Sequence, residues 1–215
     1  MQPSGTADVP KFLAWLREHE WNPDSALSFQ NNIRSFPALV RQYENSTGLW
    51  VPECSTVEMP VTPEVATLLA RAYASANRKV LYSFVFICAA FVAVCTFGNY
   101  LADPKADLAV PAAIAAGFAC VGYAGAWMAW VQPIWTDVQG KSFLRATGPV
   151  QIAVPTGKYS SGPVGRLADR RVLLGFSGGL EELRNLGWGT VDYSPRGHVI
   201  LRAWDHAGRS VYEAS

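Results

Sequence analysis

The sequence has few of the residues that build disulfide frameworks or metal centres. Of its four cysteines, Cys88, Cys95 and Cys120 lie inside apolar segments, and only Cys54 lies in a polar flank. This is not the paired pattern of a small disulfide-rich domain. No two cysteines have zinc-ligand spacing, and the three histidines are far apart in the chain. We therefore expect neither a metal site nor a cofactor.

Charge is absent from two long stretches in the middle of the chain. No charged residue occurs between Lys79 and Asp103, and none occurs between Asp107 and Asp137. A buried helix of a soluble protein rarely runs this far without a charge, whereas a segment in a bilayer does so as a rule. The chain is therefore expected to be an integral membrane protein with the lipid bilayer as its first partner.

The lengths of the two uncharged stretches fit two membrane crossings. Residues 80–101 form 22 uncharged and mostly large apolar residues, which as a helix span roughly 30 Å, the thickness of the hydrocarbon core. Residues 108–131 are long enough as well. The connection at 102–107 permits only an antiparallel hairpin. We predict two transmembrane helices joined by a short external loop.

Aromatic residues stand near the ends of the predicted spans, where amphipathic rings prefer the headgroup layer. The predicted interface anchors are Tyr82, Tyr100, Trp127, Trp130 and Trp135.

The orientation follows from the basic residues beside the spans. Five flank the hairpin on its terminal sides, namely Arg71, Arg78, Lys79, Lys141 and Arg145, and the connecting loop has only Lys105. Because basic residues near helix ends stay in the cytoplasm, both termini of this multi-pass protein should be cytoplasmic. The first twenty residues have no basic segment followed by an apolar run, so insertion is expected to rely on the hairpin itself.

The second predicted span is rich in small residues at four-residue spacing. The candidate helix-packing residues are Ala112, Ala116, Gly117, Cys120, Ala124 and Gly125. Rows of this kind let membrane helices approach closely. The sequence leaves two uses open: packing inside the hairpin, or self-association through the second span. The absence of ionisable residues from both spans disfavours a transporter.

The polar flanks are predicted to form two small parts on the cytoplasmic side. Residues 1–61 are expected to be a helical segment that ends in an extended connector at 49–61. Residues 62–79 form a helix that starts at Thr62-Pro63-Glu64, with a cap, a proline and an acid in suitable places. This helix is expected to continue into the first span.

After the hairpin, residues 132–147 are expected to be a linker and residues 148–215 a small, mostly antiparallel β domain. Its predicted strands lie at 150–154 and 171–175 and in a meander after a short helix at 180–186. The fold class is thus a membrane α-helical hairpin with an N-terminal helical segment and a C-terminal α+β domain. The near-neutral charge gives no reason to expect a nucleic-acid partner.

A short pattern in the last part of the chain resembles a known group. A membrane hairpin followed by a compact β domain with Gly187, Val191, Tyr193, Pro195 and Leu201 is similar to uncharacterised prokaryotic proteins with two transmembrane helices. That resemblance implies architecture and no activity.

One motif points to catalysis. Residues 175–179 match G-x-S-x-G around Ser177, with Asp192 and His206 downstream in the chain order of a hydrolase triad. Such an elbow needs a large parallel sheet and an oxyanion hole, and only 38 residues follow Ser177. The turn interpretation is preferred, and no catalytic residue is assigned.

The sequence therefore favours a non-enzymatic membrane protein that acts as a scaffold, an accessory or a self-assembling subunit. Its expected partner is another copy of itself or a different membrane protein. A membrane-bound serine hydrolase using Ser177 and His206 is the first alternative. A small channel or pore-forming oligomer is the second.

Overall fold

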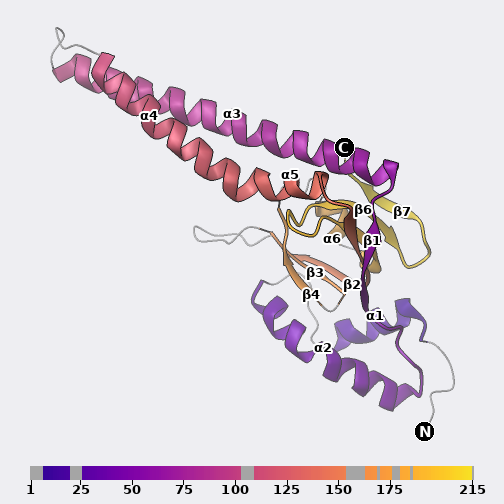
Figure 1. Cartoon of the computed structure of the whole chain (residues 1–215). Coiled ribbons are helices and arrows are strands. Elements are labelled where there is room, and N and C mark those ends of the chain that lie inside the picture. The colour runs from indigo at the N-terminus through magenta and orange to yellow at the C-terminus, as the bar shows by residue number, and fades with distance from the viewer. Residues whose placement is uncertain are drawn as a thin grey trace.

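In the computed structural model the described residues are 7–19, 26–102, 109–153, 163–168, 170–175, 180–184 and 186–214, with backbone only at 26–35, 99, 102 and 111. Two long apolar helices run side by side as a hairpin that projects from an open, mostly antiparallel sheet (Figure 1). Two further helices lie at the opposite end of the sheet. The layout is α+β, as the sequence indicates.

The hairpin consists of α3, Pro63–Ala102, and α4, Ala109–Ala126. Thr62 starts α3 as predicted, since its side-chain oxygen accepts a hydrogen bond from the backbone N–H of Val65 at 3.3 Å. The 40 residues of α3 continue without a break from the sheet into the apolar segment. One rigid element therefore belongs to both parts of the molecule.

A short π-helical turn, η1, Trp127–Val131, joins α4 to α5, Gln132–Val138. The backbone N–H of Gln132 donates to the carbonyl of Trp127, five residues back. The wider turn comes just before Pro133, whose ring would clash with a carbonyl of a regular preceding turn. Because a π turn adds a residue, it rotates the α5 side chains relative to those of α4. The stretch predicted as a linker thus contains α5 and the start of a strand.

Within the described residues the sheet has seven strands, in the order β4-β3-β2-β5-β6-β7, with β1 paired to β2 off this path. The strands are β1 Ser55–Pro60, β2 Ser142–Ala153, β3 Val164–Leu167, β4 Arg170–Leu173, β5 Gly187–Tyr193, β6 Ile200–Asp205 and β7 Ser210–Glu213. Every pair is antiparallel. The first half of β2 pairs with β1 and its second half with β3, while β5 lies along its other side.

The structure lengthens one predicted strand, places the strand expected at 171–175 at Arg170–Leu173 as β4, and adds two strands, β1 and β3. The strand expected from residue 150 is the end of β2, which begins at Ser142. The stretch at 49–61, predicted as an extended connector, contains β1. The short helix α6, Leu180–Arg184, and the β5-β6-β7 meander lie where the sequence places them.

The sheet buries both of its faces. One core joins α6 to the strands, with Leu167, Leu183 and Ile200 fully buried. On the other face the first turns of α3 pack on the sheet and bury Leu68 and Leu69. A third cluster joins α1, Val9–Glu18, and α2, Ala26–Thr47, to β5. The base of α3 is therefore held firmly against the sheet.

Candidate functional site

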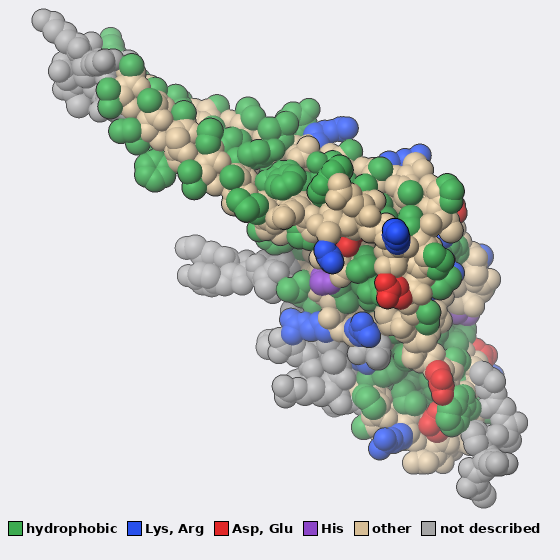
Figure 2. All heavy atoms as spheres, viewed as in Figure 1, with side chains coloured by type: hydrophobic (Ala, Val, Ile, Leu, Met, Phe, Trp, Pro, Cys, Tyr) green, Lys and Arg blue, Asp and Glu red, His purple; other side chains and the backbone are tan. Residues whose placement is uncertain are grey.

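The outer surface of the hairpin is apolar over nearly its whole length. Two helices, within Pro63–Gly98 and Ala112–Val138, are long and apolar enough to cross a membrane. In the most apolar window of each, only 6% of the residues are buried inside the molecule. Large side chains such as Phe86, 76% exposed, project outward. On the face that Figure 2 shows, hydrophobic side chains are spread along the described part of the hairpin, and charged side chains lie only toward its base and on the rest of the molecule.

The structure separates the small residues of α4 into two faces. The α4 residues with the lowest exposure recur at spacings of three and four and mark the stripe that packs on α3; they are Ala112, Ala115, Ala119, Tyr123 and Ala126. Tyr123 contacts Phe84 of α3, with ring centroids 4.8 Å apart. Five of the six candidate helix-packing residues lie outside this stripe and are exposed: Ala116, Gly117, Cys120, Ala124 and Gly125. The sixth, Ala112, is half-buried.

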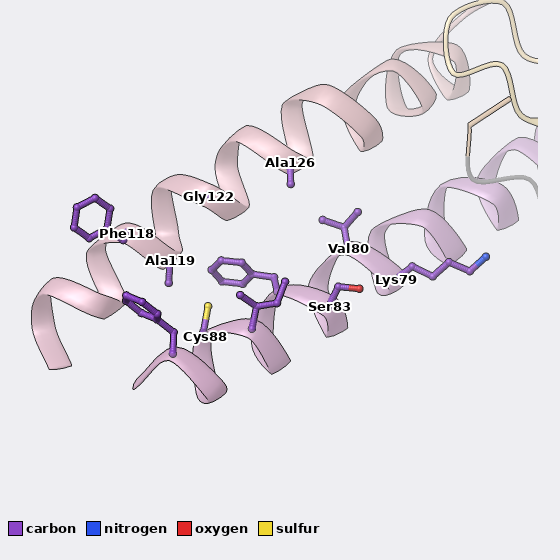
Figure 3. A pocket seen from close by; sticks show the side chains of 11 residues that line it. Lys79, Val80, Ser83, Cys88, Phe118, Ala119, Gly122 and Ala126 are labelled. Carbon is purple, nitrogen blue, oxygen red and sulfur yellow. The ribbon is translucent and has the colours of Figure 1, made fainter. Parts of the chain in front are cut away.

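A groove of about 460 Å³ lies between the two helices (Figure 3). On the α4 side the small residues Ala119, Gly122 and Ala126 face it. Its α3 side is lined by larger groups such as Phe84 and Ile87. A Cβ atom added at Gly122 meets nothing within 4 Å. The groove is almost wholly apolar, so it can accept hydrocarbon and offers little for polar chemistry.

The predicted interface aromatics are largely exposed. Tyr82, Tyr100 and Trp130 present most of their surface outward, and Trp127 is half-buried. Trp135 is 38% exposed and contacts Tyr73 of α3, with centroids 5.0 Å apart. Trp130 and Trp135 thus stand at the base of the hairpin, where it meets the sheet.

A buried carboxylate fastens this base to the sheet. Asp137 of α5 is 3% exposed, and its Oδ2 accepts hydrogen bonds from the backbone N–H groups of Arg196 and Gly197 at 3.0 and 2.7 Å. These two residues lie in the turn between β5 and β6. A Cβ atom on Gly197 would stand 2.6 Å from Ile134 Cγ1, so only glycine allows this approach. The sequence did not predict this contact between Asp137 and the turn at Arg196 and Gly197.

Next to this contact is a junction pocket of about 500 Å³. It is lined by Ala129, Trp130 and Pro133 of the helical side, by Pro163, Leu173, Leu174 and Gly175 around β3 and β4, and by Arg196, Gly197 and His198 of the turn. The Arg196 side chain is exposed and makes no hydrogen bond or ion pair with the described residues. His198 has a positive φ of 50°, an uncommon conformation for a residue with a side chain.

A second polar group lies across β2, β5 and β6. Asp192, fully buried, accepts from Arg145 Nε and Nη2 at 2.7 and 2.9 Å and from Arg202 Nε at 2.8 Å. Arg202 also pairs with Glu64 of α3 at 2.8 Å. Both guanidinium groups lie over the Trp204 ring, 5.5 and 4.9 Å from its centroid. The cluster ties the start of α3 to three strands.

These contacts shift the basicity of both arginines. The side-chain hydrogen bond to Asp192 raises the pKa of Arg145. Burial acts to lower the pKa of Arg202, but the hydrogen bonds to Asp192 and Glu64 outweigh it and the net direction is upward. Both arginine side chains therefore stay cationic near neutral pH.

The surroundings of Asp192 and His206 differ from those expected in the alternative hydrolase triad. Ser177 lies outside the described residues. Both carboxylate oxygens of Asp192 accept hydrogen bonds from arginines. His206 is exposed in the turn between β6 and β7, at the edge of a separate cleft of about 450 Å³ that also includes Arg145 and Trp188. No group of metal-ligating side chains occurs among the described residues.

The five residues that carry the resemblance to the prokaryotic group lie in β5, in β6 and in the turn between them. Gly187 opens β5 with a φ of +67°, Val191 and Leu201 are buried, and Tyr193 is among the largest fully buried side chains. Pro195 lies in the turn that Asp137 holds. The pattern thus covers the core strands and the turn of the junction. No family model, curated protein or solved structure matches the chain.

Proposed function

We propose that this chain is a non-enzymatic integral membrane protein that assembles with copies of itself and holds a folded sheet domain at the cytoplasmic face of a membrane. The observation that carries the proposal is the exposed apolar surface of the hairpin, of which almost nothing is covered inside the molecule. Exposing a surface of this size to water is strongly unfavourable, and a bilayer removes it from water. In this proposal α3 and α4 cross the bilayer.

The pairing of β1 with β2 supports a common side for both ends of the hairpin. β1 precedes α3 and β2 follows α5, yet Ser55 pairs with Thr147 and Pro60 with Ser142. A sheet built from both flanks needs both flanks in one compartment. The excess of basic residues beside the base of the hairpin assigns that compartment to the cytoplasm.

Cysteine labelling tests the orientation. In a chain whose native cysteines are replaced by alanine, a single cysteine is placed in the 103–108 connection or at Ala207, an exposed residue of the β6–β7 turn. A membrane-impermeant maleimide should label the first from outside intact cells and the second only in inverted vesicles. The reverse pattern contradicts the assignment. Labelling of both positions from one side contradicts membrane crossing itself.

The outward small residues of α4 support self-assembly. Small side chains on a membrane helix let a second helix approach closely, and van der Waals packing then stabilises the pair. Because Ala116, Gly117, Cys120 and Ala124 are not used against α3, they remain accessible to another copy. The interface would run along the outer face of α4, away from the groove.

Substitution of Gly117 by leucine tests this interface without disturbing the hairpin. A Cβ atom at Gly117 meets nothing within 4 Å, so the added side chain points only toward a partner. The matched control is Gly98→Leu on α3, where a Cβ atom also meets nothing. We expect Gly117→Leu to shift the chain toward monomer in mild detergent, while Gly98→Leu leaves its oligomeric state unchanged.

Cross-linking in membranes gives an independent readout. A variant that keeps Cys120 alone should form a disulfide-linked dimer under mild oxidation, because Cys120 is exposed beside the proposed interface. A variant with its only cysteine at Val94, on the outer surface of α3, is the control. Equal dimer yields at both positions, together with no effect of Gly117→Leu, would exclude assembly through α4.

A further inference from the structure

We infer that the junction pocket binds the head group of an anionic phospholipid. This inference rests on the proposed membrane insertion and adds a specific lipid site to it. The pocket combines three properties. It lies at the base of the hairpin, it has beside its apolar wall a cation, Arg196, with no side-chain partner among the described residues, and its turn is held by backbone contacts.

The position of the pocket fits a headgroup site. Its helical wall is formed by Ala129, Trp130 and Pro133, which directly follow the apolar length of α4. Trp130 is 53% exposed, and tryptophan at the end of a membrane helix lies at the level of the headgroups. With the hairpin inserted, the pocket therefore opens where lipid phosphates are concentrated.

The lining suits a molecule that is anionic at one end and apolar at the other. Arg196 supplies an exposed guanidinium, which can bind a phosphate through two parallel hydrogen bonds. Trp130 and Leu173, the latter 54% exposed, supply the apolar wall. Arg170 and Arg171 are exposed on the same edge strand and add positive potential. None of the described residues that line the pocket is acidic.

The contacts that hold the turn use backbone atoms of Arg196, so among the described residues its side chain stays accessible to a ligand. Its backbone N–H, not its side chain, is bound by Asp137. Ser194 accepts from the N–H groups of His198 and Val199 across the same turn, and the His198 carbonyl accepts from Gly175 at 3.2 Å. These contacts hold His198 at its positive φ, a conformation that is unfavourable for a residue with a side chain.

The apolar wall favours a lipid over a soluble phosphate compound. A water-soluble phosphate ligand gains little from an exposed tryptophan and leucine, whereas a phospholipid places its glycerol and upper acyl segments against them. Figure 2 shows Lys and Arg side chains on the sheet next to the hydrophobic base of the hairpin, so charge and apolar surface adjoin on this side. A phospholipid can contact the charged side chains with its phosphate and the apolar surface with its glycerol and upper acyl segments.

Lipid retention in the full-length protein tests the inference. The chain is reconstituted in nanodiscs of phosphatidylcholine with about 20 mol% phosphatidylglycerol, as a stand-in for an anionic leaflet, then extracted in mild detergent. Bound lipid is counted by native mass spectrometry. We expect wild type to retain phosphatidylglycerol. Arg196→Gln should reduce the retained amount about tenfold, the effect of losing charge-assisted hydrogen bonds to a phosphate.

Two comparisons make the result specific. Arg17→Gln removes an exposed arginine of α1 that has no ion partner among the described residues, and it should retain lipid as wild type does. Leu173→Gln should weaken retention while leaving Arg196 in place. Because the turn is held through backbone atoms, Arg196→Gln should keep the circular dichroism spectrum of wild type, and Arg196→Lys should restore part of the retention.

The outcomes separate this inference from the proposed function. If the chain is released from membranes by alkaline carbonate, membrane insertion fails and the headgroup site fails with it. If the chain stays in membranes and Arg196→Gln retains lipid as wild type does, only the headgroup site is refuted. Displacement of the lipid by millimolar inorganic phosphate in wild type and in Leu173→Gln alike would assign the pocket to soluble phosphate and overturn the lipid inference.

Discussion

Replacement of Asp192 by alanine should destabilise the sheet domain more than any surface substitution. The carboxylate is fully buried and accepts three charge-assisted hydrogen bonds of 2.7–2.9 Å from Arg145 and Arg202. Removing one member of a buried ion pair costs about 3–5 kcal/mol, because the remaining charge loses its partner. The Arg145 side chain is 34% exposed and that of Arg202 13%, so water compensates part of the loss. We therefore expect Asp192→Ala to lower the free energy of unfolding by about 3 kcal/mol.

Guanidinium chloride unfolding in detergent measures this loss. Trp204 lies beneath both guanidinium groups, so its fluorescence should respond both to the substitution and to unfolding. The control is Glu181→Ala, which removes an exposed ion pair with Arg184 within α6 and should cost no more than about 0.5 kcal/mol. An Asp192→Ala loss below about 1 kcal/mol would refute the reasoning that the cluster binds α3 to the sheet.

Three further predictions follow from the turns of the sheet. Asp137→Ala should lower the free energy of unfolding by about 2–3 kcal/mol, because two backbone N–H groups lose a charged acceptor. The amides of Arg196 and Gly197 should then exchange faster with solvent. Unchanged protection of these amides would contradict the contact. Gly197→Ala should lower the free energy of unfolding by about 1–3 kcal/mol through the clash with Ile134, measured by denaturant unfolding. The backbone hydrogen bond from Arg209 lowers the pKa of Asp205. The ionised Asp205 carboxylate therefore stabilises the β6–β7 turn at pH values above the unfolded pKa of roughly 4, and this stabilisation is lost as the pH falls through the lowered pKa of the folded state. Asp205→Asn should abolish this pH dependence in amide-exchange measurements of the turn.

The hairpin and the meander could be predicted because their signals are local. A run without charge identifies an apolar helix from composition alone, and alternation between turn residues identifies β5, β6 and β7. β1 could not be identified in this way, because its residues 55–60 end in a proline and their partner strand lies beyond the hairpin. The start of β2 could not be predicted either, because Arg145 interrupts its apolar pattern and the partner of Arg145, Asp192, lies 47 residues further along the chain.

The candidate site was harder to predict than the fold. The candidate helix-packing residues of α4 recur at the same four-residue spacing, and only the packing on α3 shows that Ala112 lies on the inner stripe and Gly117 faces outward. The junction depends on a contact between Asp137 and a turn near residue 196 that no periodicity encodes. One signal was available: Asp137 is the first charged residue after the second apolar stretch. A carboxylate directly after an apolar segment needs either an internal hydrogen-bond partner or contact with water.

The pairing of β1 with β2 sets an order for biosynthesis. β1 leaves the ribosome before α3, but its partner strand is made only after α4 and α5. Until then β1, with Val57 exposed, is an unpaired edge and a substrate for chaperones or aggregation. If the hairpin crosses the bilayer as proposed, the sheet can close only when both helices have entered the bilayer and both flanks lie in one compartment. On that proposal, a chain that inserts only one helix leaves its two flanks on opposite sides of the membrane and cannot pair β1 with β2.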